Sequence, residues 1–146
     1  MKGKFIRKVG IKMNFKFIEE TLKEKYPHIN TSDHMWNELV NASIECGCGW
    51  YDLIIELVGK IEEIYKKKNI SISEFKIERI REKYGQLYFD AESRIKEVYI
   101  IISEYENKSN TVCDECGKVG KLCERNGWLE TLCEKCAHEN GYKKIE

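Results

Sequence analysis

The chain of 146 residues has little proline, no net charge and no long apolar run. Its one proline, Pro27, leaves helical segments largely uninterrupted. Its 25 basic and 25 acidic side chains cancel, which argues against a protein that coats nucleic acid by bulk electrostatics. No apolar run approaches the roughly 20 residues of a membrane-spanning helix, and no secretory signal follows the basic start. We therefore expect a cytoplasmic protein without a membrane partner.

Apolar residues make up 42% of the chain, which is enough for one domain with a modest core and a small appendage. Residues 1–13 are expected to form a basic N-terminal segment, either a solvated end or a short arm that touches phosphate. Met13 is an alternative start of the chain. The basic side chains up to residue 16 are Lys2, Lys4, Arg7, Lys8, Lys12 and Lys16.

Three stretches in the first half of the chain have the apolar spacing of helices. They cover residues 14–26, residues 32–44, where Ser32 or Asp33 would cap the start, and residues 49–68, which carry the broadest apolar stripe. The residues expected to face the core are Phe15, Ile18, Leu22 and Tyr26; Met35, Trp36, Leu39 and Val40; and Trp50, Leu53, Ile54, Leu57, Val58, Ile61, Ile64 and Tyr65.

The second half of the chain predicts a β-hairpin and then a helix. The first strand is expected over about 75–84 and the second over 87–90, with a turn near Gly85 and Gln86. Residues 91–107 repeat apolar side chains at helical spacing. The predicted fold is therefore α+β, a mainly helical domain with a small hairpin, followed by a C-terminal module.

A linker is predicted at residues 107–110, which read NKSN. It divides an α+β domain over residues 14–108 from a four-cysteine module over residues 111–146. Small polar residues between two patterned segments are typical of such a connection.

The C-terminal module contains two Cys-x-x-Cys pairs, Cys113 with Cys116 and Cys133 with Cys136. Four thiolates in a tetrahedron are a common ligand set for structural Zn²⁺. We expect a zinc-ribbon or treble-clef-like module with one structural Zn²⁺. The segments KVGKL and GWLETL would pair as a hairpin, and the last cysteine pair would open a short helix that stops at Gly141.

Other uses of the thiols and histidines remain open at this stage. A redox Cys-x-x-Cys pair is a weaker interpretation, and Cys123 is expected to be a spare thiol. His138 could replace one cysteine ligand, or could belong, with Asn140, to a nuclease of the His-Asn-His type. Cys46 and Cys48, with or without His34, could form a second, incomplete metal site.

Residues 45–50, ECGCGW, directly precede the strongest helix. Free amides at a helix start can bind an anion, although the turn could also serve only to place Trp50 in the core. On the predicted strand, basic side chains alternate and would share one face, either solvated or used to bind phosphate. The residues expected to contact a ligand are Gly47, Cys48, Gly49, Trp50, Arg79, Arg81, Lys83, Tyr84 and Trp128.

The order HMW, ECGCGWYDLI, REKYGQLYF and CDECGKVGKL…GWLETLCEKC resembles a family of small phage and prophage proteins. Members of that family carry a Cys-Gly-Asp-Gly-Trp turn, a Lys-Glu-Lys-Phe-Gly hairpin and a Cys-x-x-Cys module with Gly-Trp inside. The resemblance covers roughly residues 34–137 and implies a virus-encoded protein of the host cytosol. It implies no activity. Cys48 stands where the family pattern has Asp, and a cysteine caps a helix poorly.

No Ser/His/Asp set, carboxylate pair or phosphate loop is visible, so we expect a protein that is not an enzyme. The favoured function is host interaction or anti-defence, in which the protein sequesters a small anionic, nucleotide-like ligand or binds a host protein. The alternative is a zinc-ribbon module that binds nucleic acid or the transcription machinery. The neutral charge makes nucleic acid the less favoured partner.

Overall fold

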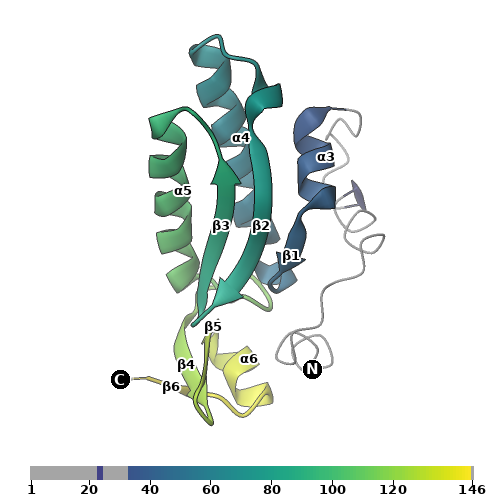
Figure 1. Cartoon of the computed structure of the whole chain (residues 1–146). Coiled ribbons are helices and arrows are strands. Elements are labelled where there is room, and N and C mark those ends of the chain that lie inside the picture. The colour runs from purple at the N-terminus through teal and green to yellow at the C-terminus, as the bar shows by residue number, and fades with distance from the viewer. Residues whose placement is uncertain (1–22, 25–32, 146) are drawn as a thin grey trace.

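The computed structural model describes residues 23–24 and 33–145. The basic segment predicted at residues 1–13 lies outside the described residues, as does the helix predicted at 14–26 except for residues 23 and 24, which are helical. Within the described ranges the fold combines helices with two three-stranded sheets (Figure 1). The predicted mixture of helix and sheet is confirmed. No described helix is long and apolar enough to cross a membrane.

The first sheet has the strand order β1–β2–β3. β1 (Ser43–Glu45) pairs in parallel with β2 (Lys76–Lys83), and β2 pairs antiparallel with β3 (Gln86–Glu92). Parallel pairing requires a crossover connection, and helix α4 (Tyr51–Lys67) supplies it. The sequence-based prediction instead ended the second helix at residue 44 and missed β1.

The β2–β3 hairpin confirms the predicted hairpin, although its turn lies at Tyr84 and Gly85, one residue earlier than predicted, and Gln86 already belongs to β3. Tyr84 and Gly85 have φ angles of 54° and 82°, as expected of a two-residue turn that matches the twist of the strands. An added Cβ at Gly85 would lie 2.6 Å from the Cδ1 atom of Leu122. The tip of the hairpin is therefore packed against the second sheet and cannot accept a larger residue without a shift.

The main core lies between the first sheet and the helices on one of its faces (Figure 1). Helix α3 (His34–Asn41) is capped by the side chain of Asp33, as predicted. α4 buries most of the predicted stripe, and helix α5 (Lys96–Lys108) packs beside it. Short 3-10 turns precede α4 (η1, Cys48–Trp50), precede β2 (η2, Ile72–Glu74) and follow α5 (η3, Ser109–Thr111). The side chains of these helices in the core are Met35, Trp36, Leu39, Val40, Tyr51, Ile54, Leu57, Val58, Ile61, Tyr65, Val98, Ile102 and Tyr105.

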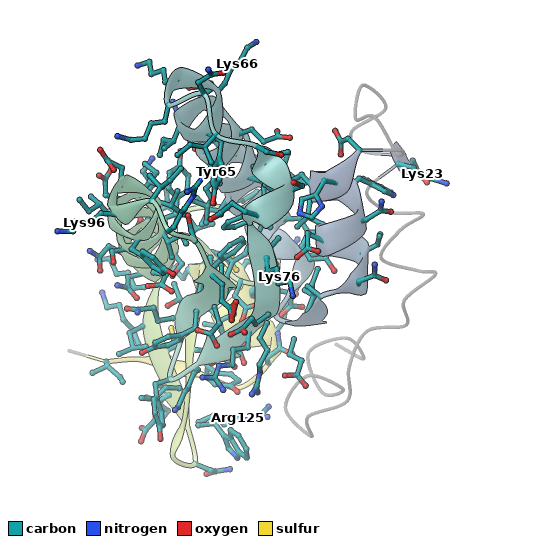
Figure 2. All side chains as sticks on the ribbon, turned by 45° about the horizontal axis from the view of Figure 1, so that its top comes forward. Lys23, Tyr65, Lys66, Lys76, Lys96 and Arg125 are labelled. Carbon is teal, nitrogen blue, oxygen red and sulfur yellow. The ribbon has the colours of Figure 1, made fainter. Side chains whose placement is uncertain are left out.

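Tyr65 joins α4 to the start of α5 through hydrogen bonds. Its hydroxyl is bonded to Glu74 and to the Oγ of Ser93, 2.5 Å away, and its side chain points inward from α4 (Figure 2). Burial, followed by the bond to Glu74, raises the pKa of Tyr65 to about 12. The helix predicted over residues 91–107 begins later than predicted, at Lys96. The reason is that β3 continues through Glu92 and a turn at Ser93 follows it.

The linker predicted at residues 107–110 is wrong. α5 continues through Lys108, and Ser109 is fully buried. The Oγ of Ser109 accepts a hydrogen bond of 2.9 Å from the backbone N–H of Leu87 and donates one to the carbonyl of Glu106. Ser109 thus connects β3 to the end of α5, because its small, buried hydroxyl satisfies one backbone group of each.

The second sheet has the order β5–β4–β6, with β4 (Lys121–Arg125) paired antiparallel to both β5 (Trp128–Leu132) and β6 (Lys143–Lys144). Helix α6 (Glu134–Glu139) follows β5, and Gly141 at φ 73° ends it as predicted. This sheet and α6 lie at one end of the molecule, beyond the tip of the β2–β3 hairpin (Figure 1). Their buried residues form a second, smaller cluster.

We predict that Ser109→Ala lowers the free energy of unfolding by about 1–3 kcal/mol, because the buried N–H of Leu87 then lacks its acceptor. Ser103→Ala is the matched control, since Ser103 is exposed on α5, the helix whose C-cap is Ser109. Urea unfolding of both variants beside the parent measures the difference. Equal losses from the two substitutions would contradict the assigned role of the hydroxyl.

Candidate metal centre

Four cysteine thiols meet at the start of α6. The sulfurs of Cys113, Cys116, Cys133 and Cys136 all lie within 4.8 Å of one another. The sulfurs of Cys116 and Cys133 are 3.6 Å apart. A tetrahedral zinc site with about 2.3 Å metal–sulfur bonds places its sulfurs about 3.8 Å apart. The four residues predicted as metal ligands are therefore brought together at a compatible spacing.

Local backbone geometry presents the two cysteine pairs to one point. In the first pair, Gly117 has φ 84° and donates to the carbonyl of Cys113 at 2.8 Å, which closes a tight turn. In the second pair, Cys133 is the N-cap of α6, and its sulfur accepts the backbone N–H of Cys136 at 3.3 Å. Such N–H···S bonds stabilise a thiolate, the form that binds metal.

The thiols differ in how readily they ionise. Burial raises the pKa of Cys116 and of Cys136. Burial also tends to raise the pKa of Cys133. Hydrogen bonds from the backbone N–H of Cys136 and from the neighbouring thiols outweigh this effect and lower the pKa of Cys133 to about 7. One thiolate therefore forms readily near neutral pH, whereas additional negative charge in the cluster requires a cation to balance it.

The turn at residues 47–49 encloses Asp114, which lies inside the first cysteine pair. The N–H of Gly47 donates to the Oδ1 of Asp114 at 3.0 Å, and the N–H of Gly49 donates to its carbonyl at 2.9 Å. Asp114 is fully buried. An added Cβ at Gly49 would lie only 2.2 Å from the carbonyl oxygen of Cys113. The glycines of ECGCGW thus permit close approach between the main domain and the cysteine cluster.

The other predicted ligand residues of this turn also face the protein. Trp50 is fully buried, and its indole N–H donates to the carbonyl of Val112 at 2.8 Å. The thiol of Cys48 is exposed and points to the carbonyl of Glu115, 3.7 Å away. The interpretation of the turn as a connection that places Trp50 in the core is confirmed. Whether a ligand binds at the turn stays a prediction, although the amides of Gly47 and Gly49 already have acceptors.

The basic row predicted on the first strand is present on the outward face of β2. Arg79, Arg81 and Lys83 pair in register with Asp90, Tyr88 and Gln86 of β3. Acidic neighbours accompany the row, since Arg79 lies 3.6 Å from Glu45 and Arg81 lies 3.7 Å from Asp90. The surface therefore carries mixed charge, which weakens its attraction for an anion.

The two aromatic side chains predicted to contact a ligand, Tyr84 and Trp128, are both exposed. Tyr84 stands at the β2–β3 tip with 70% of its surface exposed, and the ammonium of Lys83 lies 5.6 Å from its ring centre. Trp128, 53% exposed, begins β5 opposite Arg125 at the tip of the second hairpin. Arg125 marks that end of the molecule in Figure 2.

The remaining thiols, and the two histidines that lie in the described ranges, His34 and His138, are outside the four-thiol cluster. Cys123 is buried, with its sulfur 3.3 Å from the carbonyl of Lys121, as expected of a spare thiol. Cys46 is buried in the main core. His34 bonds the carbonyl of Phe75 through Nε2 at 2.7 Å. His138 is in α6 and is not one of the four clustered ligands.

Sequence reasoning missed three buried polar residues that hold the cysteine module in place. Besides Asp114, Thr131 donates from its hydroxyl to the carbonyl of Gly85 at 2.6 Å, and Asn140 donates from its amide to Glu115 at 3.2 Å and to the carbonyl of Cys136 at 2.7 Å. Asp114 could have been singled out, because it sits between two ligand positions. The sequence marks Asn140 only through the His-Asn-His interpretation, and no pattern marks Thr131.

Loss of one thiol should remove the metal. We predict that the parent, purified without added metal, carries one Zn²⁺ per chain, and that Cys133→Ser loses it together with the folded C-terminal module. Cys123→Ser is the matched control and should keep the metal, because its sulfur is not in the cluster. Elemental analysis and thiol titration measure both. Less than about half an equivalent of zinc in the parent would refute the assignment.

A side chain at position 49 should disrupt the packing of the 47–49 turn against the backbone of Cys113 and Asp114. Gly49→Val places a Cβ within 2.2 Å of the Cys113 carbonyl, so we expect a large loss of stability and easier removal of metal by a chelator. Gly59→Val is the matched control, since a Cβ there meets nothing within 4 Å. Thermal unfolding and chelator competition measure the two effects. A Gly49→Val protein as stable as the Gly59→Val protein would show that the contact is unimportant.

Comparison of the chain with models of known families, with curated proteins and with solved structures finds no match. These comparisons therefore neither support nor oppose the resemblance to phage proteins. What the protein does has to be inferred from the geometry of its own residues.

Proposed function

We propose that the four thiols bind one structural Zn²⁺ and that residues 111–146 form a treble-clef-like module. The order of a cysteine turn, a hairpin, and a helix that begins at the second cysteine pair supports this. Four cysteines fill a tetrahedral shell, so no position is left for a substrate or a reactive water. The metal would contribute folding energy to a segment with only a small core of its own.

On this basis we propose a non-enzymatic binding protein of the phage type that acts in the host cytoplasm. Its role would be host interaction or anti-defence through sequestration of a small anionic, nucleotide-like ligand. One observation carries the proposal: a hollow of about 420 Å³ lies against α6. Among the residues that the structure describes, its lining includes the basic side chains Lys121, Lys144 and His138 and one acidic side chain, Glu134. A hollow of this size suits a small molecule better than a host protein.

Binding of nucleic acid by the zinc module is the second candidate. The exposed ring of Trp128 beside Arg125 favours it, because a base can stack on such a side chain. The equal number of basic and acidic residues in the chain opposes it, since few counterions would be released on contact with DNA.

Calorimetric titration of the zinc-loaded protein separates these candidates. We expect saturable binding of at least one small anionic nucleotide from a panel of nucleoside monophosphates and cyclic dinucleotides. Duplex DNA should bind weakly and without sequence preference at physiological salt. Submicromolar binding to a plain duplex, with no response to the nucleotide panel, would replace the first function with the second.

A further inference from the structure

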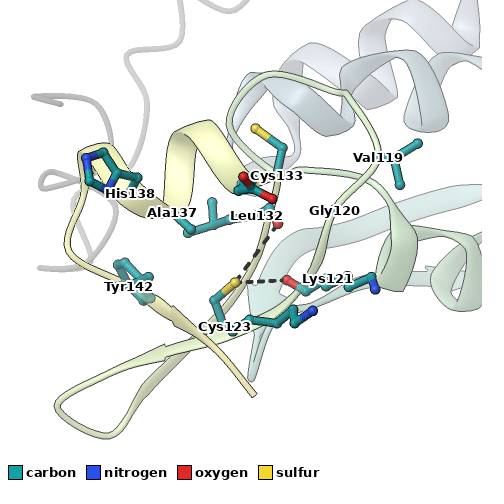
Figure 3. Close-up of a pocket in the computed structure, with 11 residues that line it drawn as sticks. Val119, Gly120, Lys121, Cys123, Leu132, Cys133, Ala137, His138 and Tyr142 are labelled. Atoms are coloured by element: carbon teal, nitrogen blue, oxygen red, sulfur yellow. Dashed lines mark hydrogen bonds between the residues drawn. The ribbon is translucent and has the colours of Figure 1, made fainter. Parts of the chain in front are cut away.

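The hollow beside the metal centre is formed by the inner face of the second sheet and by α6 (Figure 3). Its floor is apolar and contains Leu132, Ala137 and Tyr142, with the thiol of Cys123 between them. Cys133, one of the four clustered thiols, forms part of the same wall. The hollow and the proposed metal site thus share a boundary.

The floor is held in place by contacts beneath it. The guanidinium of Arg125 lies 4.7 Å from the ring centre of Tyr142, and the hydroxyl of Tyr142 donates to buried Glu130 at 3.4 Å. The sulfur of Cys123 is bonded to the carbonyl of Lys121 and lies 4.0 Å from that of Leu132. A pre-formed apolar surface of this kind favours a flat, apolar group, because little ordering is needed on binding.

Two lysines at the rim of the hollow, Lys121 and Lys144, lie on the same face of the second sheet. Lys144 of β6 pairs with Cys123 of β4, and Lys121 lies two residues before Cys123, so the two lysines point to the same face. Diagonal neighbours on one face stand roughly 7–8 Å apart, which lets two long side chains reach one anion. Neither lysine has an ion-pair partner within 4.0 Å among the residues that the structure describes.

We infer that this hollow binds a small molecule with one flat apolar body and one terminal phosphate or carboxylate. The body lies on Leu132 and Tyr142, and the anion lies between Lys121 and Lys144. The volume of about 420 Å³ fits one nucleoside monophosphate and falls in the lower part of the range for small-molecule sites. This inference rests on the proposed function and narrows it to one site and one ligand class.

The test uses the zinc-loaded full chain and adenosine 5′-monophosphate, with guanosine, cytidine and uridine monophosphates as further probes. We expect at least one monophosphate to bind, and to bind at least about tenfold more tightly than its uncharged nucleoside or inorganic phosphate. The two partial probes report the anionic contact and the apolar contact separately. Absence of binding by all four monophosphates overturns the inference.

Substitution of the rim locates the site. Lys144→Glu should weaken binding at least about tenfold, whereas Lys144→Arg should largely retain it. Lys143→Glu is the matched control, because its side chain points to the opposite face of the same short strand and does not line the hollow. Equal effects of Lys143→Glu and Lys144→Glu would indicate bulk charge and overturn the site.

Amide chemical-shift mapping of the parent protein makes the result independent of any variant. Addition of the monophosphate should shift the amides of Gly120, Lys121, Ala137 and Lys144 more than that of Gly85 at the other hairpin. Shifts confined to other surfaces overturn the site even if binding is tight. Binding of cyclic dinucleotides without monophosphate binding would leave the proposed function standing and refute this inference alone.

Discussion

The enclosure of Asp114 by the turn at residues 47–49 is the contact on which the two halves of the protein depend. The main core and the cysteine module each have their own cluster of buried residues, and the second is too small to be stable alone. Asp114 is held through both its carboxylate and its carbonyl, and the indole of Trp50 adds a third bond at Val112. The conformation of the cysteine turn is thereby tied to the start of α4.

The same hydrogen bonds explain why the amides before α4, which are suited to an anion, do not require an external one. Glycines and unpaired amides before a helix favour negative charge, and here the chain supplies a carboxylate of its own from a residue 67 positions away. A sequence pattern specifies the chemistry of the acceptor but not whether that acceptor belongs to the same chain. Only the three-dimensional structure identifies Asp114 as the acceptor for the amide of Gly47.

Features set by local rules were predictable from the sequence. The stripe of α4, the Asp33 cap, the turn at Gly85 and the spacing of the four cysteines depend on residues close together in the chain. The errors concern residues whose roles depend on distant partners. β1 is only three residues long and is stabilised by pairing with β2. The sequence around Ser109 is typical of a loop, and its buried role depends on the hydrogen bond with distant Leu87. The hollow is formed by three separate strands and α6, so no single stretch of sequence reveals it.

The long separation between Gly47 and Asp114 also bears on the order in which the chain acquires its structure. During synthesis the start of α4 is made well before the residue that satisfies its amides, and closing so large a loop carries an entropic cost. The helices and the β2–β3 hairpin can form from contacts nearer in sequence, but the amides of Gly47 and Gly49 cannot bond Asp114 until the cysteine module has been made. The cysteine module, made after α4, therefore completes the structure of a segment that precedes it in the chain.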